Sequence, residues 1–183
     1  MSQLRVPISQ GDHIKGSSQA RITLVEYGDY ECASCRRVVA VLDRVLSCFP
    51  SDVRFVYRHF PTSELHPQAV AAAEIAEAAA AQDRFWDMHA LLYEQHQALT
   101  LGSLLRLGSL LHLDLDRMRA ELARHAYLPK IEADFKGGVR SGVWGTPSVF
   151  LGDVRYDAPL QVAGIVATID QMLDSDLAAR PPR

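Results

Sequence analysis

The sequence predicts an α/β domain whose sheet is interrupted by an all-helical block. Three patterns along its 183 residues indicate this fold class. Strand, helix and strand patterns follow one another first, a long helical stretch comes next, and strand patterns return before a final helix. A chain of this length fits one domain with an insertion. We expect residues 1–61 and 142–175 to form the two halves of the sheet domain, 62–141 the inserted helical domain, and 176–183 a flexible tail.

The first half of the sheet domain has the pattern of a strand–helix–strand unit. Residues 1–20 are polar and are expected to form a loose leading edge. Residues 22–27 are β-branched and aromatic, which predicts a strand buried on both faces. A second strand is predicted over residues 53–60, ending at Pro61, and the two strands should pair in parallel. Apolar residues recur at helical spacing between Cys32 and Cys48, at Val38, Val41, Leu42, Val45 and Leu46.

The middle of the chain is predicted to be helical throughout. Pro67 and the alanine-rich run after it favour one helix. Residues 102–113 contain two copies of a six-residue pattern, which we interpret as a single further helix. Asp114 or Asp116 is expected to cap the next helix, and another is predicted over residues 128–139. One apolar cluster at helical spacing is expected to be core rather than a peptide-binding surface: Phe85, Trp86, Met88, Leu92 and Tyr93.

Strand patterns return after Gly142. Residues 148–151 predict a strand, and Gly152 with Asp153 predicts a hairpin turn into residues 154–156. A final amphipathic helix is predicted from the apolar spacing of Val162, Ile165, Val166, Ile169 and Leu173.

Composition excludes several classes of protein. The net charge of −3 and the pI near 6.1 lack the basic footprint of a nucleic-acid binder, so no nucleic-acid partner is expected. The longest apolar run, residues 69–81, is interrupted by Glu74 and Glu77 and is too short to span a membrane. The first residues show no apolar core or cleavage site of a secretory signal, so a cytoplasmic location is expected.

Two of the three cysteines, Cys32 and Cys35, form a Cys-x-x-Cys segment at the start of a predicted helix after a buried strand. Unsatisfied N–H groups and the helix dipole favour a thiolate on the first cysteine there. The second cysteine can then resolve a mixed disulfide, so a dithiol redox site is predicted. Cys48, on the same helix, is too far from Cys35 for a disulfide and is expected to be a small buried apolar residue.

A metal site is the alternative interpretation of the cysteine pair. A structural zinc site needs four ligands, usually from two such pairs or from two cysteines and two histidines. The sequence has no second cysteine pair and no histidine between Cys32 and Cys35. We therefore expect no metal and no organic cofactor.

Two separated segments carry a resemblance to a known family. Residues 24–35, Leu-Val-Glu-Tyr-Gly-Asp-Tyr-Glu-Cys-Ala-Ser-Cys, resemble the active-site segment of DsbA-like thiol–disulfide oxidoreductases of the thioredoxin superfamily. Residues 145–150, Gly-Thr-Pro-Ser-Val-Phe, resemble that family's cis-proline loop. The helical block matches its inserted domain in place and length, and residues 12–16 resemble the lead-in of its signal-less bacterial members. The resemblance implies a thioredoxin fold with an inserted all-helical domain.

The resemblance also implies roles for individual residues. Cys32 would attack and carry the mixed disulfide, and Cys35 would resolve it. Pro147, in cis after Thr146, would lie against the disulfide and keep metals away, while the Thr146 backbone would pair with an extended substrate segment. Glu26 matches a buried carboxylate that relays a proton to the resolving cysteine. Independently, a lone glutamate inside an apolar strand should have a raised pKa, although a surface or salt-bridged position is the alternative.

This sequence departs from the family pattern at three positions. Many relatives have proline after the first cysteine, and the strongest oxidants have histidine before the second; here these residues are Ala33 and Ser34. We therefore expect the pKa of Cys32 to be lowered less than in the most oxidising members, and the direction of electron flow stays open. Trp144, close to the cis-proline, would either flank a substrate groove or pack under the loop.

These patterns predict a cytoplasmic thiol–disulfide oxidoreductase that acts on protein or peptide thiols and disulfides with a redox partner of unknown identity. Two alternatives remain open. One is a binding or chaperone-like module that keeps the fold without turnover. The other is a redox enzyme that depends on glutathione or another small molecule.

Overall fold

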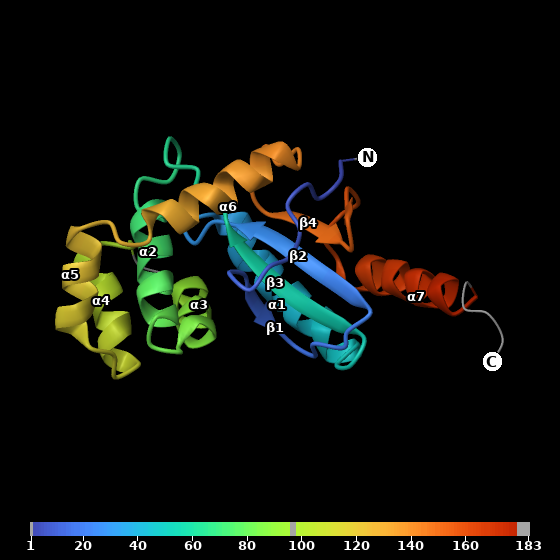
Figure 1. The fold of residues 1–183 in the computed structure, drawn as a ribbon, viewed down its shortest axis with the longest axis horizontal. Coiled ribbons are helices and arrows are strands. Elements are labelled where there is room, and N and C mark those ends of the chain that lie inside the picture. The colour runs from blue at the N-terminus through green and yellow to red at the C-terminus, as the bar shows by residue number, and fades with distance from the viewer. Residues whose placement is uncertain (1, 96–97, 179–183) are drawn as a thin grey trace.

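The computed structural model describes residues 2–95 and 98–178, and it confirms the predicted α/β class (Figure 1). Its five-stranded sheet has the order β1-β3-β2-β4-β5. Strand β2 pairs in parallel with β3 and antiparallel with β4, while β1 and β5 pair antiparallel at the two edges. The strands are β1 (His13–Lys15), β2 (Ile22–Gly28), β3 (Val53–His59), β4 (Ser148–Leu151) and β5 (Val154–Arg155).

Helices cover both faces of the sheet (Figure 1). Because side chains alternate along a strand, Leu24 of β2 joins the larger core with α1 and α7, and its neighbour Val25 joins a smaller core beneath α6. The predicted burial of β2 on both faces is thus confirmed. The helices in the described residues are α1 (Ala33–Cys48), α2 (Ala69–Ala80), α3 (Phe85–Glu94), α4 (Leu101–Leu110), α5 (Leu115–Ala123), α6 (Leu128–Arg140) and α7 (Val162–Ala178).

The helical stretch between β3 and β4 has two parts. Helices α2 to α5 pack on one another, whereas α6 returns to lie along the sheet against β3. Two glycines let α6 approach closely, because a Cβ atom added at Gly138 would lie 2.7 Å from the ring of Phe60. The apolar cluster expected to be core is buried at Phe85, Met88, Leu92 and Tyr93 and half-buried at Trp86, so this prediction is confirmed.

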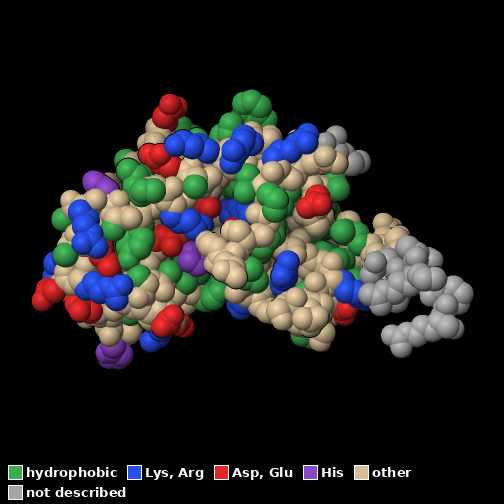
Figure 2. All heavy atoms as spheres, in the orientation of Figure 1, with side chains coloured by type: hydrophobic (Ala, Val, Ile, Leu, Met, Phe, Trp, Pro, Cys, Tyr) green, Lys and Arg blue, Asp and Glu red, His purple; other side chains and the backbone are tan. Residues whose placement is uncertain are grey.

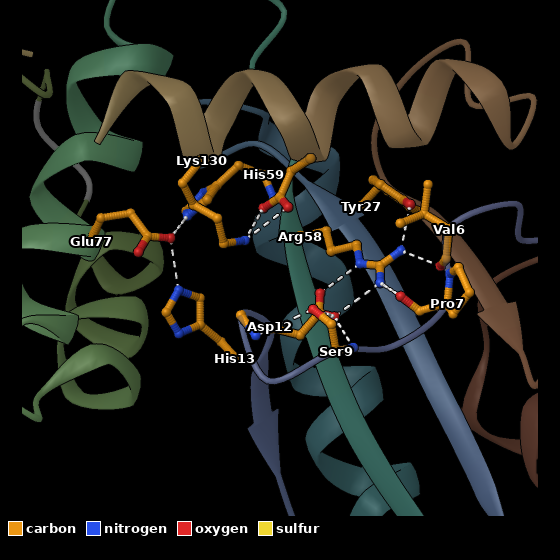
Figure 3. Close-up of polar contacts among 12 residues, drawn as sticks. Val6, Pro7, Ser9, Asp12, His13, Tyr27, Arg58, His59, Glu77 and Lys130 are labelled. Atoms are coloured by element: carbon orange, nitrogen blue, oxygen red, sulfur yellow. Dashed lines mark hydrogen bonds and ion pairs between the residues drawn. The ribbon is translucent and has the colours of Figure 1, made fainter. Parts of the chain in front are cut away.

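The N-terminal segment corrects one expectation. Residues 1–20 were expected to form a loose edge, but their described part, residues 2–20, is attached to the sheet: β1 pairs with β3, and Gln3 forms a bridge with Val154 of β5. The Arg58 guanidinium donates to both carboxylate oxygens of Asp12, at 2.7 and 3.0 Å, and to two backbone carbonyls of the segment (Figure 3). The polar composition concealed this attachment, because a buried ion pair and backbone bonds hold the segment together with a few half-buried apolar side chains, among them Leu4 and Ile8 against the smaller core.

The final helix is longer than its apolar spacing suggested. It continues through residues 176–178, which were expected to begin a flexible tail, while residues 179–183 lie outside the described part of the chain. Among the described helices, none combines the length and the apolar character needed to cross a membrane.

Candidate active site

The two paired cysteines lie at the N-terminus of α1, as their position after a buried strand predicts. Cys32 is the N-cap residue, with extended backbone angles, and its carbonyl accepts the first helical hydrogen bond, from the Arg36 N–H. Cys35 lies one turn later and is fully buried, whereas Cys32 is 7% exposed. Both are free thiols, so the structure shows the reduced pair.

The surroundings of Cys32 favour its thiolate. A hydrogen bond from Cys35 is the largest influence, and it outweighs burial to bring the pKa of Cys32 down to about 5. A hydrogen bond with the Thr146 side chain and the backbone N–H groups of Ser34 and Cys35 lower the pKa further. For Cys35, the hydrogen bond to Cys32, burial and the charge of Glu26 all raise the pKa. One sulfur is therefore prepared to attack and the other to stay protonated.

Glu26 lies inside β2 and is fully buried, which settles the choice between a buried and a surface position. Neither of its carboxylate oxygens has a hydrogen-bond partner in the described part of the chain. Burial, followed by the charges of Cys32 and Asp43, raises the pKa of Glu26 to about 8. A carboxyl group with such a pKa can hold or release a proton near neutral pH.

A small cavity connects Glu26 to the exterior. It encloses about 50 Å³, more than the roughly 10–15 Å³ that one water molecule needs. Lys15 and Asp43 line it together with Glu26, and the Lys15 Nζ lies 3.8 Å from an Asp43 carboxylate oxygen in an exposed ion pair. Water in this cavity would carry protons between Glu26 and solvent.

The loop before β4 faces the cysteines. The Thr146–Pro147 peptide bond is cis, and the Cys32 Sγ lies 3.5 Å from the Thr146 carbonyl oxygen. Trp144 is 87% exposed, so it does not pack under the loop. It lines a groove of about 390 Å³ between this loop, the C-terminal half of α6 and the loop after β3, where Leu65 is 77% exposed.

His66 also belongs to this neighbourhood, and sequence reasoning missed it. It lies on the loop between β3 and α2, and its Nδ1 is 2.8 Å from an Asp29 carboxylate oxygen. Asp29 in turn lies three positions before Cys32 and is buried. No local motif could reveal this residue, because 34 positions separate His66 from Cys32 and only the parallel pairing of β2 with β3 brings their strand ends together.

A second polar cluster, distant from the cysteines in sequence, joins β1, β3 and α2 (Figure 3). The Nε2 atoms of His13 and His59 lie 2.7 and 2.8 Å from one oxygen of Glu77. Two histidines and a glutamate form a donor set that zinc uses, but these separations are hydrogen-bond lengths. The Nδ1 of His59 is buried without a partner in the described residues, whereas a metal-bound histidine ordinarily donates from its second nitrogen. Hydrogen bonding therefore accounts for the cluster.

Cys48 contradicts its sequence prediction. It is exposed at the C-terminal end of α1 instead of buried. The apolar stripe of α1 that faces the core includes Val38, Leu42 and Val45, and Cys48 falls outside it. Free cysteines are usually buried, but this general tendency did not predict the exposure of Cys48 at the end of a helix.

The fold and the site together define a protein of the thioredoxin superfamily with a DsbA-like fold. The features that define it are the order of the strands, the inserted helices, and a Cys-x-x-Cys segment that begins α1 beside a cis-proline loop. A family model described as Thioredoxin matches residues 9–171, and the chain belongs to that family. The structure is similar to BdbD from Bacillus subtilis, with a TM-score of 0.81 and 22% identity over 90% of this chain and 94% of the other. It is also similar to a thioredoxin-like oxidoreductase from Silicibacter pomeroyi, with a TM-score of 0.79 and 24% identity over 91% and 94% of the two chains.

A curated relative extends well beyond this chain. The Na⁺/H⁺ antiporter NhaA 3 of Salinispora tropica is 39% identical over 167 residues, which are 91% of this chain. The chain spans only 26% of the length of that relative. The description of the relative therefore concerns a much longer protein.

Proposed function

We propose that the protein is a thiol–disulfide oxidoreductase that exchanges disulfides with protein or peptide substrates. The observation that carries this proposal is the asymmetry of the cysteine pair. Cys32, at the start of α1 and against Thr146, has its pKa lowered to about 5, and Cys35 behind it is kept protonated. Such a pair can transfer two electrons without a metal or an organic cofactor.

In the first step, the Cys32 thiolate attacks one sulfur of a substrate disulfide. A bond forms between Cys32 and that sulfur, the substrate S–S bond breaks, and the other substrate sulfur leaves as a thiolate. The Thr146 backbone, next to the reacting sulfur, is available to pair with an extended substrate segment.

In the second step, Cys35 attacks the Cys32 sulfur. The negative charge on Cys32 disappears when the mixed disulfide forms, which removes one cause of the raised pKa of Glu26. The Glu26 carboxylate can then take the Cys35 proton and pass it to water in the adjacent cavity. A Cys32–Cys35 disulfide forms, the substrate leaves as a second thiolate, and the substrate has gained the two electrons that the cysteine pair has lost.

Reduction of insulin disulfides in the presence of dithiothreitol tests this proposal. The wild-type protein should accelerate the precipitation of insulin, and Cys32→Ser should not. The variant Cys48→Ser is the matched control, because it removes an exposed sulfur at the far end of α1 and should keep full activity. Equal rates for the wild-type protein and Cys32→Ser would overturn the proposal and leave a binding module without turnover.

A comparison of two substrates distinguishes the proposed function from the alternative of a glutathione-dependent enzyme. An enzyme that depends on glutathione should reduce a glutathione mixed disulfide much faster than insulin. The exposed groove beside Trp144 instead favours an apolar peptide segment as the substrate. A measured reduction potential of the Cys32–Cys35 couple would assign the direction of electron flow.

A cytoplasmic location is also part of the proposal. Cellular reductants there would keep the pair as a dithiol and favour a reductase role. Fractionation of cells that express the protein, with detection by antibody, tests this location, and recovery outside the cytoplasmic fraction would refute it.

A further inference from the structure

A histidine from a distant part of the chain lies next to the segment that carries the nucleophile. The backbone N–H of Cys32 donates to the Asp29 carbonyl oxygen at 3.1 Å, and the N–H of Glu31 donates to the Asp29 Oδ1 at 2.9 Å. The other carboxylate oxygen of Asp29 contacts His66 Nδ1 at 2.8 Å. A single buried carboxylate thus connects His66 to the turn that leads into α1.

Several further hydrogen bonds fix the loop that carries His66. Thr62 donates to the same Asp29 oxygen from its backbone N–H, at 2.9 Å, and from its hydroxyl, at 2.7 Å. The Gln68 N–H donates to a carboxylate oxygen of Glu31 at 2.7 Å. His66 is therefore held in place against the turn that leads into Cys32, although its ring remains partly open to solvent.

The charges around His66 favour its protonated form. Burial lowers the pKa of His66, but the hydrogen bond and the charge of Asp29, followed by the charges of Cys32 and Glu31, raise it overall. All three of these acidic groups come from the segment between β2 and α1. On its own loop, Glu64 is exposed.

We propose that protonated His66, held by Asp29, is a positioning residue that stabilises the Cys32 thiolate. This stabilisation ends when a rise in pH removes the positive charge of His66. The inference rests on the proposed function, because it concerns the same nucleophile. The Cys-x-x-Cys segment has Ser34 where a histidine could stand, so the segment itself supplies no cation between its cysteines. A residue from the loop after β3 provides it instead.

The contribution of His66 is smaller than that of the direct hydrogen bonds to Cys32. Those bonds, from Cys35, Thr146 and the backbone, dominate the lowered pKa of Cys32. These hydrogen bonds persist as the pH changes, whereas His66 loses its positive charge once the pH exceeds its raised pKa. The direct hydrogen bonds therefore favour the Cys32 thiolate at every pH, and the additional stabilisation from His66 varies with pH.

Reciprocal titration of the wild-type protein is the first test. If the His66 cation stabilises the Cys32 thiolate, the thiolate must stabilise the cation to the same extent. Proton NMR of the histidine rings should therefore show a higher midpoint for His66 in the reduced protein than in the oxidised protein, where Cys32 carries no charge. The missing resonance of His66→Gln assigns the signal. Equal midpoints in both redox states would overturn the proposal without any need for a variant with altered chemistry.

Thiolate absorbance of the reduced protein is the second test. His66→Gln should raise the pKa of Cys32 by roughly half a unit, which is about a threefold loss of thiolate below the midpoint. His66→Lys should restore the wild-type value, because it returns a cation that does not titrate near neutral pH. His125→Gln is the matched control, since His125 also pairs with a carboxylate, Glu74 at 3.0 Å, but on the loop before α6.

An unchanged Cys32 titration in His66→Gln would refute the proposal. So would a failure of His66→Lys to restore the titration, since His66 would then act through shape alone. Either failure can be told apart from failure of the proposed function, because Cys32→Ser would still abolish insulin reduction if only the inference about His66 were wrong.

Discussion

At the residue scale, the candidate chemistry depends on where the protons of three buried groups lie. The thiolate of Cys32 is stabilised by Cys35, and its charge in turn opposes ionisation of Glu26. Each group therefore titrates in a way that depends on the others, and observed midpoints belong to the coupled set. Substitutions that remove one proton donor at a time can separate the contributions.

The hydrogen bond between the two cysteines can be tested with a matched pair of variants. Cys35→Ala removes the donor, whereas Cys35→Ser keeps a donor of similar size. A hydrogen bond to a charged group contributes about 1.5–3 kcal/mol, so Cys35→Ala should raise the pKa of Cys32 by roughly one to two units. Cys35→Ser should raise it much less. Thiolate absorbance against pH measures both, and the same pKa in the two variants would contradict the assigned cause.

The buried carboxyl group of Glu26 should make stability depend on pH. Its pKa is about 8 in the folded protein and near 4.5 in the unfolded chain, so the unfolded state ionises first and stability falls as the pH rises from 4.5 to 8. The full loss is on the order of 5 kcal/mol, and Glu26→Gln should remove it. Urea unfolding of reduced wild-type protein and variant at pH 5 and pH 8 measures the difference. If the difference in unfolding free energy between the wild-type protein and Glu26→Gln were the same at pH 5 and pH 8, the raised pKa of Glu26 would be refuted.

Single residues also show what the sequence could and could not predict. Cys32, Cys35 and Glu26 were found because strand and helix patterns surround them. Cys48 lies at the end of α1 and Trp144 lies on the loop before β4, so helical or strand periodicity could not indicate whether either side chain is exposed. His66 reaches the site only through tertiary pairing of two strands, so no local pattern could indicate it.

At the scale of elements, the N-terminal segment is the part whose role the sequence concealed. Its attachment to β3 depends on Arg58, which is almost fully buried and bonded to Asp12 at 2.7 and 3.0 Å. Burial opposes ionisation of Asp12, but the hydrogen bond from Arg58 lowers its pKa overall. This ion pair therefore supports the fold at neutral pH and loses its contribution as the pH falls below about 3.8.

Breaking this pair should cost far more than breaking an exposed one. Asp12→Asn leaves the Arg58 charge buried without its partner, so we expect a loss of roughly 3 kcal/mol in the free energy of unfolding. Glu132→Gln is the control, because Glu132 pairs with Lys136 at 2.7 Å on the surface of α6 and should cost less than about 1 kcal/mol. Urea unfolding at pH 7 gives both values. Similar losses in the two variants would mean that the segment is held mainly by its backbone bonds.

At the scale of the whole molecule, the helical stretch and the sheet together form the groove beside the site. One wall comes from Trp144 and the loop before β4, and others come from α6 and the loop after β3. Charged side chains of both signs are interspersed with apolar ones on the face shown in Figure 2. The overall architecture was predictable from element order, whereas the groove was not, because it forms where segments far apart in the sequence meet.

The groove should distinguish large substrates from small ones. Trp144→Ser removes an exposed ring, so it should change stability by less than about 0.5 kcal/mol and leave the pKa of Cys32 unaltered. It should raise KM for insulin several-fold while leaving the reaction with a small aromatic disulfide unchanged. Arg155→Ser, on β5, is a comparison outside the groove lining. An equal loss with both substrates would indicate damage to the nucleophile rather than to substrate binding.

The N-terminal segment has a consequence for synthesis on the ribosome. Residue 3 bridges to β5 at one edge of the sheet, and residues 13–15 pair with β3 at the other edge, so residue 3 must wait for a partner that is synthesised about 150 residues later. Contacts of such long sequence separation form late, since a long loop must close first. This segment should thus be among the last of the described parts to acquire its native contacts, although it leaves the ribosome before its partners do.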